Sequence, residues 1–365
     1  MNLEMLLKTV QINNLRCFER LDVTLGKKST VISGGNGTGK TTALEAISLV
    51  CQGKSFVSNR SGDIVRRGAP GASVIASGKT GISDPVNIHV RKKGVKTEIT
   101  VNGNPVKKAS ELARSAPAIV ITSHAATLLT EGPDKRRALL DKTMFHVEPS
   151  YIEEWKKYRR ALRQRNQLIR GRNLRKIHRA WNEQLLSVGE EIDRKREDIV
   201  LRLNAELKGK TISRFFGGLY FRYSPGWNRE KGYRLCLSQS WERDEQLGYT
   251  TVGPHRADLA LCDKNGPVAR NLSGGQSKFL VCFVLCSLAK YIFQKTAKKP
   301  LILVDDIAAE LDDVFITSVL NMLLKQEGQV VLTSIRSAEL VGFSKNVDAV
   351  LQLDQIRHKN HDQME

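Results

Sequence analysis

The sequence predicts an α/β fold in two lobes, with a phosphate-binding loop on a parallel sheet and an inserted pair of antiparallel helices. The apolar run Ser29–Ser33 is followed by a glycine-rich segment and then by Ala43–Val50, which has helical spacing. A second apolar run, Leu301–Val304, ends in two carboxylates. Between these motifs, the charged segment 146–212 has the periodicity of a helix pair. We therefore expect a head of two chain segments, 1–145 and 213–365, interrupted by a helical arm.

The segment Gly34–Thr41 fits the phosphate-loop pattern G-x-x-x-x-G-K-[ST]. Glycines at these positions let successive backbone N–H groups point at a phosphate without Cβ clashes. Lys40 is expected to reach the β- and γ-phosphates of ATP, and the Thr41 hydroxyl to bind Mg²⁺. The predicted nucleotide contacts in this loop are Gly34, Asn36, Gly37, Thr38, Gly39, Lys40, Thr41 and Thr42.

Two adjacent aspartates follow the strand Leu301–Val304. Asp305 ends a buried strand, which suits a carboxylate that holds Mg²⁺ beside the phosphate loop. Asp306 stands where a carboxylate can orient the attacking water, so the predicted catalytic residues are Lys40, Asp305 and Asp306, with Thr41 and Asp305 as metal ligands. The alternative is that the two aspartates cap a helix or a turn.

The segment Leu272–Gln276, called the signature segment below, reads Leu-Ser-Gly-Gly-Gln and is typical of ABC-type ATPases. Ser273, Gly274 and Gly275 would offer a hydroxyl and backbone N–H groups to a γ-phosphate at a helix N-terminus. In ABC-type heads this segment covers the nucleotide of a second copy, so an ATP-dependent homodimer is predicted. Alone, the pentapeptide is also compatible with a plain glycine-rich helix start.

The net charge of +20 indicates a polyanionic partner, with solubility by repulsion as the alternative. Part of the surplus lies in the predicted arm, where residues 151–180 contain 11 Lys or Arg against two Glu. Two apolar stripes predict its helices: Trp155, Tyr158, Leu162 and Ile169, then Leu185, Val188, Ile192 and Ile199. The predicted DNA contacts on the first helix are Arg159, Arg160, Arg163 and Arg165. The alternative is a solvated helix pair that braces the fold.

The remaining features indicate a reduced, cytoplasmic protein without a membrane partner. The six cysteines show no zinc-site spacing, and Cys282 and Cys286 are predicted to lie one turn apart on a buried helix. No secretion signal is recognisable at the start, and the longest apolar run, 279–289, is too short to span a bilayer. Residues 354–365 are expected to be disordered.

Further strands are predicted along the head from short alternating runs. Val86–Val90 and Lys96–Val101 are expected to form a hairpin, and Ala118–Thr122 a single strand. After the arm, Leu219–Tyr223 and Tyr233–Leu237 are predicted as strands.

The combination of motifs resembles the RecF family of bacterial recombination mediators. The segments that carry the resemblance are the signature segment, Gly253–Arg256, Asp305–Asp312, Gly39–Ile47, Gly53–Phe56, Gly132–Asp141 and Gln164–Asn166. The resemblance implies a head like those of structural-maintenance-of-chromosomes (SMC) proteins, with a short arm and a weak, DNA-stimulated ATPase that acts as a switch. It also implies ATP-dependent pairing on DNA at single-strand gaps next to duplex, and action with RecO and RecR in loading RecA. Ser273 would act in trans, and Arg256 belongs to a family motif without an assigned role.

Two positions depart from related patterns. Ser123-His124 follows the strand Ala118–Thr122 where the family is expected to have a proline and an acidic residue, so no γ-phosphate sensor is predicted there. Ser334 stands where transporter ATPases carry a switch histidine. An ABC-type transporter subunit is the main alternative function, but the 231 residues between Thr41 and Ser273 exceed the usual transporter spacing.

Overall fold

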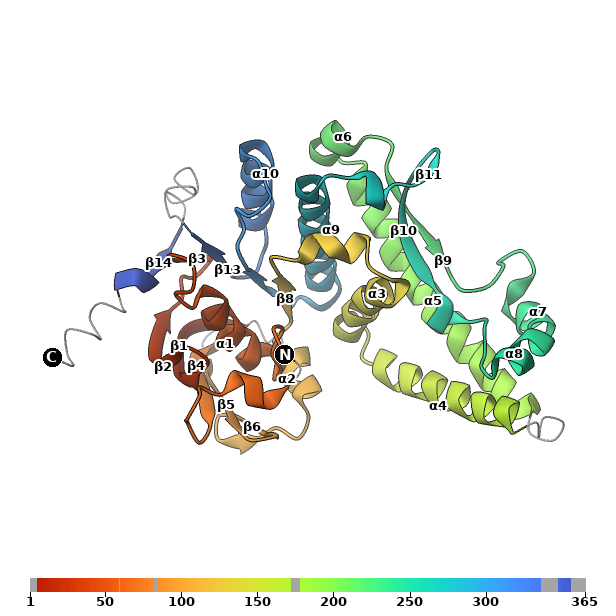
Figure 1. Cartoon of the computed structure of the whole chain (residues 1–365), viewed down its shortest axis with the longest axis horizontal. Coiled ribbons are helices and arrows are strands. Elements are labelled where there is room, and N and C mark those ends of the chain that lie inside the picture. Colours follow the sequence, from red (N-terminus) through yellow and green to blue (C-terminus); the bar gives the residue numbers. More distant parts are fainter. Residues whose placement is uncertain (1–4, 59, 82–83, 172–177, 336–346, 356–365) are drawn as a thin grey trace. The chain divides into compact units, whose positions relative to one another are not determined.

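The computed structural model describes residues 5–58, 60–81, 84–171, 178–335 and 347–355. The chain forms two compact units (Figure 1). Unit 1 comprises Met1–Ala126 and Ser273–Glu365, and unit 2 comprises Thr127–Leu272. Both predicted limits of the arm, 146 and 212, fall inside unit 2, so the division into head and arm stays a prediction.

Unit 1 contains an antiparallel sheet of six strands in the order β2-β1-β4-β5-β6-β7. Apolar and polar residues alternate along these strands, because one face is buried and the other is not. The predicted hairpin is confirmed as β5 and β6, in which Lys93 lies opposite Lys96. The strands are β1 Met5–Leu15, β2 Phe18–Thr24, β4 Ala72–Thr80, β5 Asp84–Lys93, β6 Lys96–Val101 and β7 Asn104–Pro105.

The second sheet of unit 1 is entirely parallel, in the order β14-β3-β13-β12-β8. Every residue of the three central strands is buried, as expected for a parallel sheet covered on both faces. The strands are β3 Ser29–Ser33, β8 Ala118–Ile121, β12 Leu301–Val304, β13 Val330–Ser334 and β14 Ala349–Gln352. One strand, β13, therefore lies between the strand that leads into the phosphate loop and the strand that leads into Asp305.

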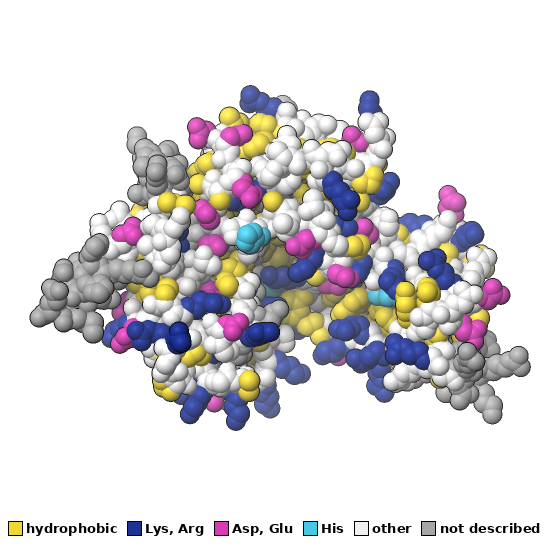
Figure 2. All heavy atoms as spheres, in the orientation of Figure 1, with side chains coloured by type: hydrophobic (Ala, Val, Ile, Leu, Met, Phe, Trp, Pro, Cys, Tyr) yellow, Lys and Arg dark blue, Asp and Glu magenta, His cyan; other side chains and the backbone are white. Residues whose placement is uncertain are grey.

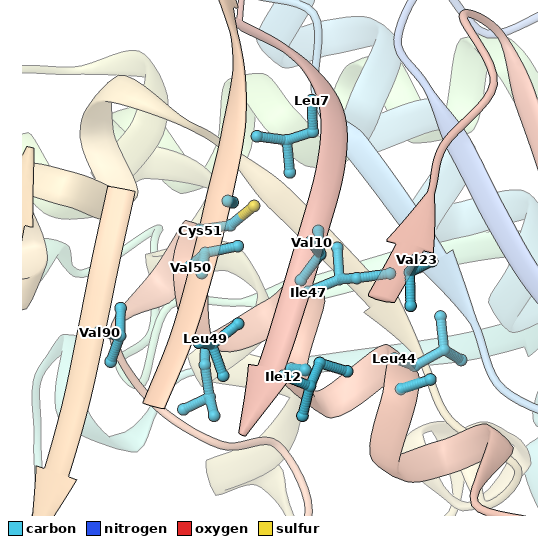
Figure 3. Packing of buried hydrophobic residues seen from close by; sticks show 14 of the residues in the cluster. Leu7, Val10, Ile12, Val23, Leu44, Ile47, Leu49, Val50, Cys51 and Val90 are labelled. Atoms are coloured by element: carbon cyan, nitrogen blue, oxygen red, sulfur yellow. The ribbon is translucent and has the colours of Figure 1, made fainter. Parts of the chain in front are cut away.

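The helix after the phosphate loop, α1 (Lys40–Gln52), contacts strands of both sheets. All of its residues except Thr41 are buried. Leu44 and Ile47 pack against Val10 and Ile12 of β1, together with other side chains of the core (Figure 3). A helix that is held on all sides fixes the position of its N-terminus, where the phosphate loop ends.

Further helical segments of unit 1 are η1 Ser61–Ile64, α2 Ala109–Ser115, α9 Gly274–Thr296 and α10 Asp313–Leu324. Cys282 and Cys286 are buried on α9, as predicted, and burial raises the pKa of Cys282 to about 12. By length and composition alone, α9 passes as a membrane-spanning helix, but 61% of its apolar window is buried inside the structure. This burial is what the core helix of a folded unit shows.

Unit 2 contains six helices and the three-stranded sheet β11-β10-β9 within the described residues. Helix α4 packs against α5, and the two run antiparallel. Glu154 pairs with Lys195, and Tyr158, further along α4, lies beside Gly189, which comes earlier on α5. The helices are α3 Pro133–Val147, α4 Tyr151–Arg170, α5 His178–Leu207, α6 Lys210–Phe216, α7 Gly232–Gln239 and α8 Trp241–Leu247. The strands are β9 Tyr220–Ser224, β10 Asp258–Asp263 and β11 Gly266–Pro267, and short 3₁₀ turns span Pro254–Arg256 and Ala269–Asn271. A further 3₁₀ turn, Ala125–Leu129, includes the last two residues of the first segment of unit 1 and the first three of unit 2.

The predicted strand Tyr233–Leu237 is wrong, because this segment is helix α7. A strand would place Leu235 on the same face as Tyr233 and Leu237. Instead Tyr233 and Leu237, one helical turn apart, are buried with Leu186, while Leu235 is 46% exposed. A run of five residues is too short to distinguish the two-residue period of a strand from the 3.6-residue period of a helix. Packing against α5 favours the helix here.

The segment Gly253–Arg256 forms a turn whose first three residues are held by packing. Gly253 has φ +137°, and a Cβ there would lie 2.5 Å from the Tyr158 hydroxyl. The Tyr158 hydroxyl lies 2.7 Å from His255 Nδ1, and His255 Nε2 lies 3.0 Å from the Thr250 carbonyl oxygen. Burial lowers the pKa of His255 to about 4, so the ring is neutral at pH 7.

This buried histidine makes the stability of unit 2 depend on pH. The folded pKa lies below the usual 6.5, so His255 contributes no penalty above pH 6.5 and costs stability as pH falls toward 4. The loss should amount to about 3 kcal/mol over that interval. All four tryptophans lie in unit 2, so tryptophan fluorescence during urea unfolding reports on this unit. His255→Gln should lose less stability than the wild type between pH 7.5 and pH 4.5; equal losses would contradict the assignment.

Candidate nucleotide site and basic helix face

The phosphate loop connects β3 to α1 and has the backbone that its glycines predict. Gly37 and Gly39 have φ values of +76° and +103°, a region that side chains with a Cβ avoid. A Cβ on Gly39 would also lie 2.4 Å from the Phe18 ring and 2.8 Å from Cys17 Sγ. The turn between β1 and β2 therefore packs directly on the loop. The loop itself is tightened by the Thr38 hydroxyl, which donates to the Gly35 carbonyl at 2.9 Å.

Lys40 lies at the base of the loop with its side chain buried. Its ammonium donates to the carbonyl oxygens of Gly34 and Gly35, at 2.7 and 2.8 Å. The positive charge is thus held over the loop, at the N-terminus of α1, where backbone N–H groups and the helix dipole also favour an anion. This is the arrangement that a phosphate-binding role for residues 34–42 requires.

The two predicted metal ligands, Thr41 and Asp305, lie in contact with each other. The Thr41 hydroxyl lies 3.0 Å from both carboxylate oxygens of Asp305, which is 6% exposed. The hydroxyl of Thr333, on the strand between them, donates to Asp305 at 3.0 Å. Burial raises the pKa of Asp305, against the effect of the two hydroxyls. A hydroxyl and a carboxylate at this spacing suit Mg²⁺, which takes oxygen ligands; when bound, the ion would neutralise charge on the phosphates.

Asp306 follows in a left-handed conformation, with φ +49°. Asp tolerates this region better than most residues with a Cβ. Its backbone N–H donates to the Thr333 hydroxyl at 2.7 Å. Its Oδ1 is buried and has no hydrogen-bond partner among the described residues. An unsatisfied carboxylate oxygen of this kind can accept a hydrogen bond from a water, as the predicted role of Asp306 requires.

Residues 273–276 of the signature segment belong to unit 1 and include the start of α9. Ser273 caps the helix: its hydroxyl accepts from Gln276 N–H at 3.1 Å, while the Gln276 side chain accepts from Ser273 N–H. The Ser273 O–H stays available as a donor, and Ser273 and Gly274 are exposed. A Cβ on Gly275 would lie 2.6 Å from the Glu310 carbonyl oxygen. The second signature glycine therefore allows α9 to approach the turn that follows Asp306.

Lys278 is a residue of this site that the sequence did not indicate. It is fully buried on the second turn of α9. Its ammonium donates to the carbonyl oxygens of Asp306 and Ala309, at 2.7 and 2.6 Å. Burial lowers its pKa. Since a buried cation is costly unless it is satisfied, these two bonds fix the signature helix to the turn that holds Asp306. A lysine at a helix start beside an apolar run carries no sequence signal for such a role.

The predicted DNA contacts divide into two groups. Arg159, Arg160 and Arg163 are exposed on α4, and none makes an ion pair within the part of the chain that the structure describes. Arg165 was wrongly placed with them: its side chain is 4% exposed, and Nη1 lies 2.6 Å from Asp244. Helical geometry puts Arg165 on the opposite side of α4, against α8, so it is not available to DNA.

The predicted disorder is wrong for Asp354, the first residue of the predicted tail. Leu353 is buried, and both carboxylate oxygens of Asp354 accept from Gly35 N–H, at 3.2 Å each. Residues 356–365 lie outside the described residues. Asp354 is therefore part of the surroundings of the phosphate loop.

These features define a class. The ATPase heads of ABC-type proteins combine three such features: a phosphate loop, an aspartate at the end of a strand, and an exposed signature segment at the start of a helix. Here one strand, β13, separates the strand before the loop from the strand before the aspartate. The fold is the SMC-like form of such a head. The family model described as the RecF/RecN/SMC N-terminal domain matches residues 6–358. The chain belongs to the RecF family within this group.

The assignment to the RecF family rests on curated relatives named "DNA replication and repair protein RecF". The protein from Aliivibrio salmonicida (strain LFI1238) is 31% identical over 94% of this chain and 96% of its own length. The Vibrio cholerae protein (strain O395) is 32% identical over 92% and 94%. The Shewanella piezotolerans protein is 34% identical, also over 92% and 94%. The transporter alternative has no support from these matches.

Solved structures agree on the fold. A structure of the recombination mediator protein RecF with ATP, in the RecFOR pathway, has a TM-score of 0.78 and 22% identity, covering 92% of this chain and 95% of that one. An SMC head bound to the C-terminal winged-helix domain of ScpA has a TM-score of 0.57 and 16% identity, over 95% and 93%. At these identities, the likeness is one of fold.

The position of Cys17 offers a direct test of the nucleotide site. This exposed thiol lies beside Gly39 and 3.8 Å from the Thr42 hydroxyl. Nucleotide on the loop should therefore shield it, and at 100 times the Kd the alkylation rate should fall roughly 100-fold if only free protein reacts. Mass spectrometry after timed alkylation measures this rate. Cys236, on α7 of unit 2, is the internal control and should react at the same rate throughout. Protection of Cys17 that persists in Lys40→Ala would contradict the predicted site.

Proposed function

We propose that the protein is an ATP-dependent DNA-binding protein of DNA replication and recombinational repair, in which two copies close on each other when ATP binds. The observation that carries the proposal is the state of the signature segment. Ser273 and Gly274 are exposed, with a spare hydroxyl donor and backbone N–H groups at the start of α9. A second copy with nucleotide on its phosphate loop would present the anion that suits them.

In this proposal, residues of one chain bind the nucleotide and residues of its partner complete the site. Lys40 and the loop N–H groups hold the phosphates, and Thr41 and Asp305 hold Mg²⁺. Asp306 orients the attacking water through its buried Oδ1. Its side chain is one methylene shorter than the glutamate usual in ABC-type heads, so turnover should be slow. ATP then acts as a switch: it favours the closed pair, and hydrolysis removes the bridging charge.

The proposed DNA contact is the exposed basic face of α4, formed by Arg159, Arg160 and Arg163. Lysine and arginine side chains gather over α4 in Figure 2. Arginines without acidic partners keep their full charge for phosphates, and the net charge of +20 favours a polyanion in general. The relatives are named as DNA replication and repair proteins. By analogy we propose DNA at single-strand gaps beside duplex as the ligand, RecO and RecR as partners, RecA loading as the outcome and the cytoplasm as the location.

The pairing step is tested by the mass of the full chain in solution. With a slowly hydrolysed ATP analogue, the wild type should shift from monomer to dimer, and gapped DNA should strengthen the shift. Ser273→Arg should bind the analogue with unchanged affinity but stay monomeric, because the added side chain blocks the signature surface. Lys40→Ala should lose both nucleotide and dimer. A wild type that stays monomeric under every condition would refute ATP-gated pairing.

The DNA contact is tested by the salt dependence of binding to duplex. Replacing Arg159, Arg160 and Arg163 together by Gln should reduce the slope of log affinity against log salt by up to about 3, since each phosphate contact contributes roughly 0.9. The matched control replaces Arg194, Arg202 and Arg234, which are exposed but paired with acidic residues. This control changes the net charge equally and should leave the slope unchanged. Equal slopes for both triple variants would place the DNA site elsewhere.

A further inference from the structure

The segment between α8 and the turn at Gly253 is held by a buried polar network. Arg165 Nη1 donates to Asp244 at 2.6 Å and to the Thr250 hydroxyl at 2.7 Å. The other carboxylate oxygen of Asp244 accepts from the N–H and the hydroxyl of Thr251, at 2.8 and 2.6 Å. Removing one partner of a buried ion pair is strongly destabilising, because it leaves an uncompensated buried charge. These bonds therefore connect residues 244–251 firmly to α4.

Within this segment, α4 fixes the backbone on both sides of Tyr249. The Arg170 guanidinium donates to the Gly248 carbonyl at 3.2 Å, and Thr250 N–H donates to the Asn166 side chain at 2.9 Å. The Tyr249 N–H donates to the Asp244 carbonyl at 3.2 Å. The Tyr249 side chain nevertheless remains 37% exposed. The network therefore presents one aromatic ring to solvent from a rigid backbone.

A second side chain joins this ring. The Arg256 guanidinium lies 4.8 Å from the centre of the Tyr249 ring, and Arg256 is exposed. Its backbone is held by the neighbouring His255, which contacts the Tyr158 hydroxyl and the Thr250 carbonyl. Tyr249 thus supplies an aromatic face, and Arg256 supplies a guanidinium group, which also stacks on aromatic rings.

The pair lies beside the basic face of α4. Asn166 and Arg170, which hold the Tyr249 backbone, follow Arg159 and Arg163 at spacings of three, four and seven residues. Residues at these spacings share one side of a helix. Tyr249 and Arg256 therefore continue the row of arginines at the C-terminal end of α4, all within unit 2.

We propose that Tyr249 and Arg256 form a stacking platform for an unpaired base of the DNA whose backbone lies on α4. The inference rests on the proposed function and deepens it, because it assigns recognition of the junction between duplex and single strand to one surface. Every base offers a π face to an aromatic ring, so the platform needs no particular sequence. This surface carries the exposed arginines Arg159, Arg163 and Arg256, and a one-sided basic surface of this kind favours a nucleic acid as the partner.

The test compares affinities of the full chain, with a slowly hydrolysed ATP analogue, for blunt duplex and for the same duplex with a single-strand extension. Tyr249→Leu should lose roughly 5- to 150-fold of the preference for the extended DNA while blunt-duplex affinity is kept. Tyr249→Phe retains the ring and should behave as the wild type. Tyr220→Leu, which removes another exposed tyrosine of unit 2, should also retain the preference.

A second measurement needs no variant. A 2-aminopurine at the first unpaired position should be quenched by the wild type, and the same label inside the duplex should not. If Tyr249→Leu keeps the full preference for extended DNA, the platform is refuted while the proposed function stands. If the wild type binds neither DNA, both fail. Equal affinities of all four proteins for extended DNA, with no quenching, would assign the exposed ring to a protein partner instead.

Discussion

The candidate nucleotide site depends on one buried carboxylate. Asp305 is removed from water at the end of β12, which would be costly without hydrogen bonds to its oxygens. Thr41 of α1 and Thr333 of β13 supply them. Hydrogen bonds to a charged group each contribute about 1.5–3 kcal/mol. Thr41 lies at the start of the helix after β3, Thr333 on β13 and Asp305 at the end of β12, so these hydrogen bonds also fix the position of the phosphate loop relative to the strand that ends in the aspartates.

A second set of contacts joins the site to the surface. Lys278 reaches from the signature helix to the carbonyls of Asp306 and Ala309, and Gly275 lets the helix approach Glu310. Asp306 and Glu310 both have positive φ values, so the turn between them is held in an uncommon conformation. The signature helix is therefore in direct contact with the turn that carries the carboxylate proposed to orient water.

Sequence patterns predicted local features well and distant partners poorly. The phosphate loop, the strand before it and α1 were predictable because their glycine spacing and periodicity lie within about 20 consecutive residues. Arg165 looked like its exposed neighbours because its partner, Asp244, is far along the chain. Lys278 donates to backbone carbonyl oxygens, and it reaches them only because the chain turns after Asp306. A pattern of side chains in the sequence does not show such a contact. Tyr233–Leu237 was too short for its period to separate strand from helix.

The order of strands in the parallel sheet determines when the candidate nucleotide site can form during synthesis. Strand β3 lies between β13 and β14, and both come from residues beyond 329. During synthesis, the strand that carries the phosphate loop is therefore made early but lacks both neighbours until the last part of the chain has emerged. Unit 2 is one continuous segment of the chain, so all of its residues have been synthesised before the last strands of unit 1. Chains are made from the N-terminus, and compact units fold as they are completed. A nascent or C-terminally truncated chain can thus hold a formed unit 2 while it has no competent phosphate loop.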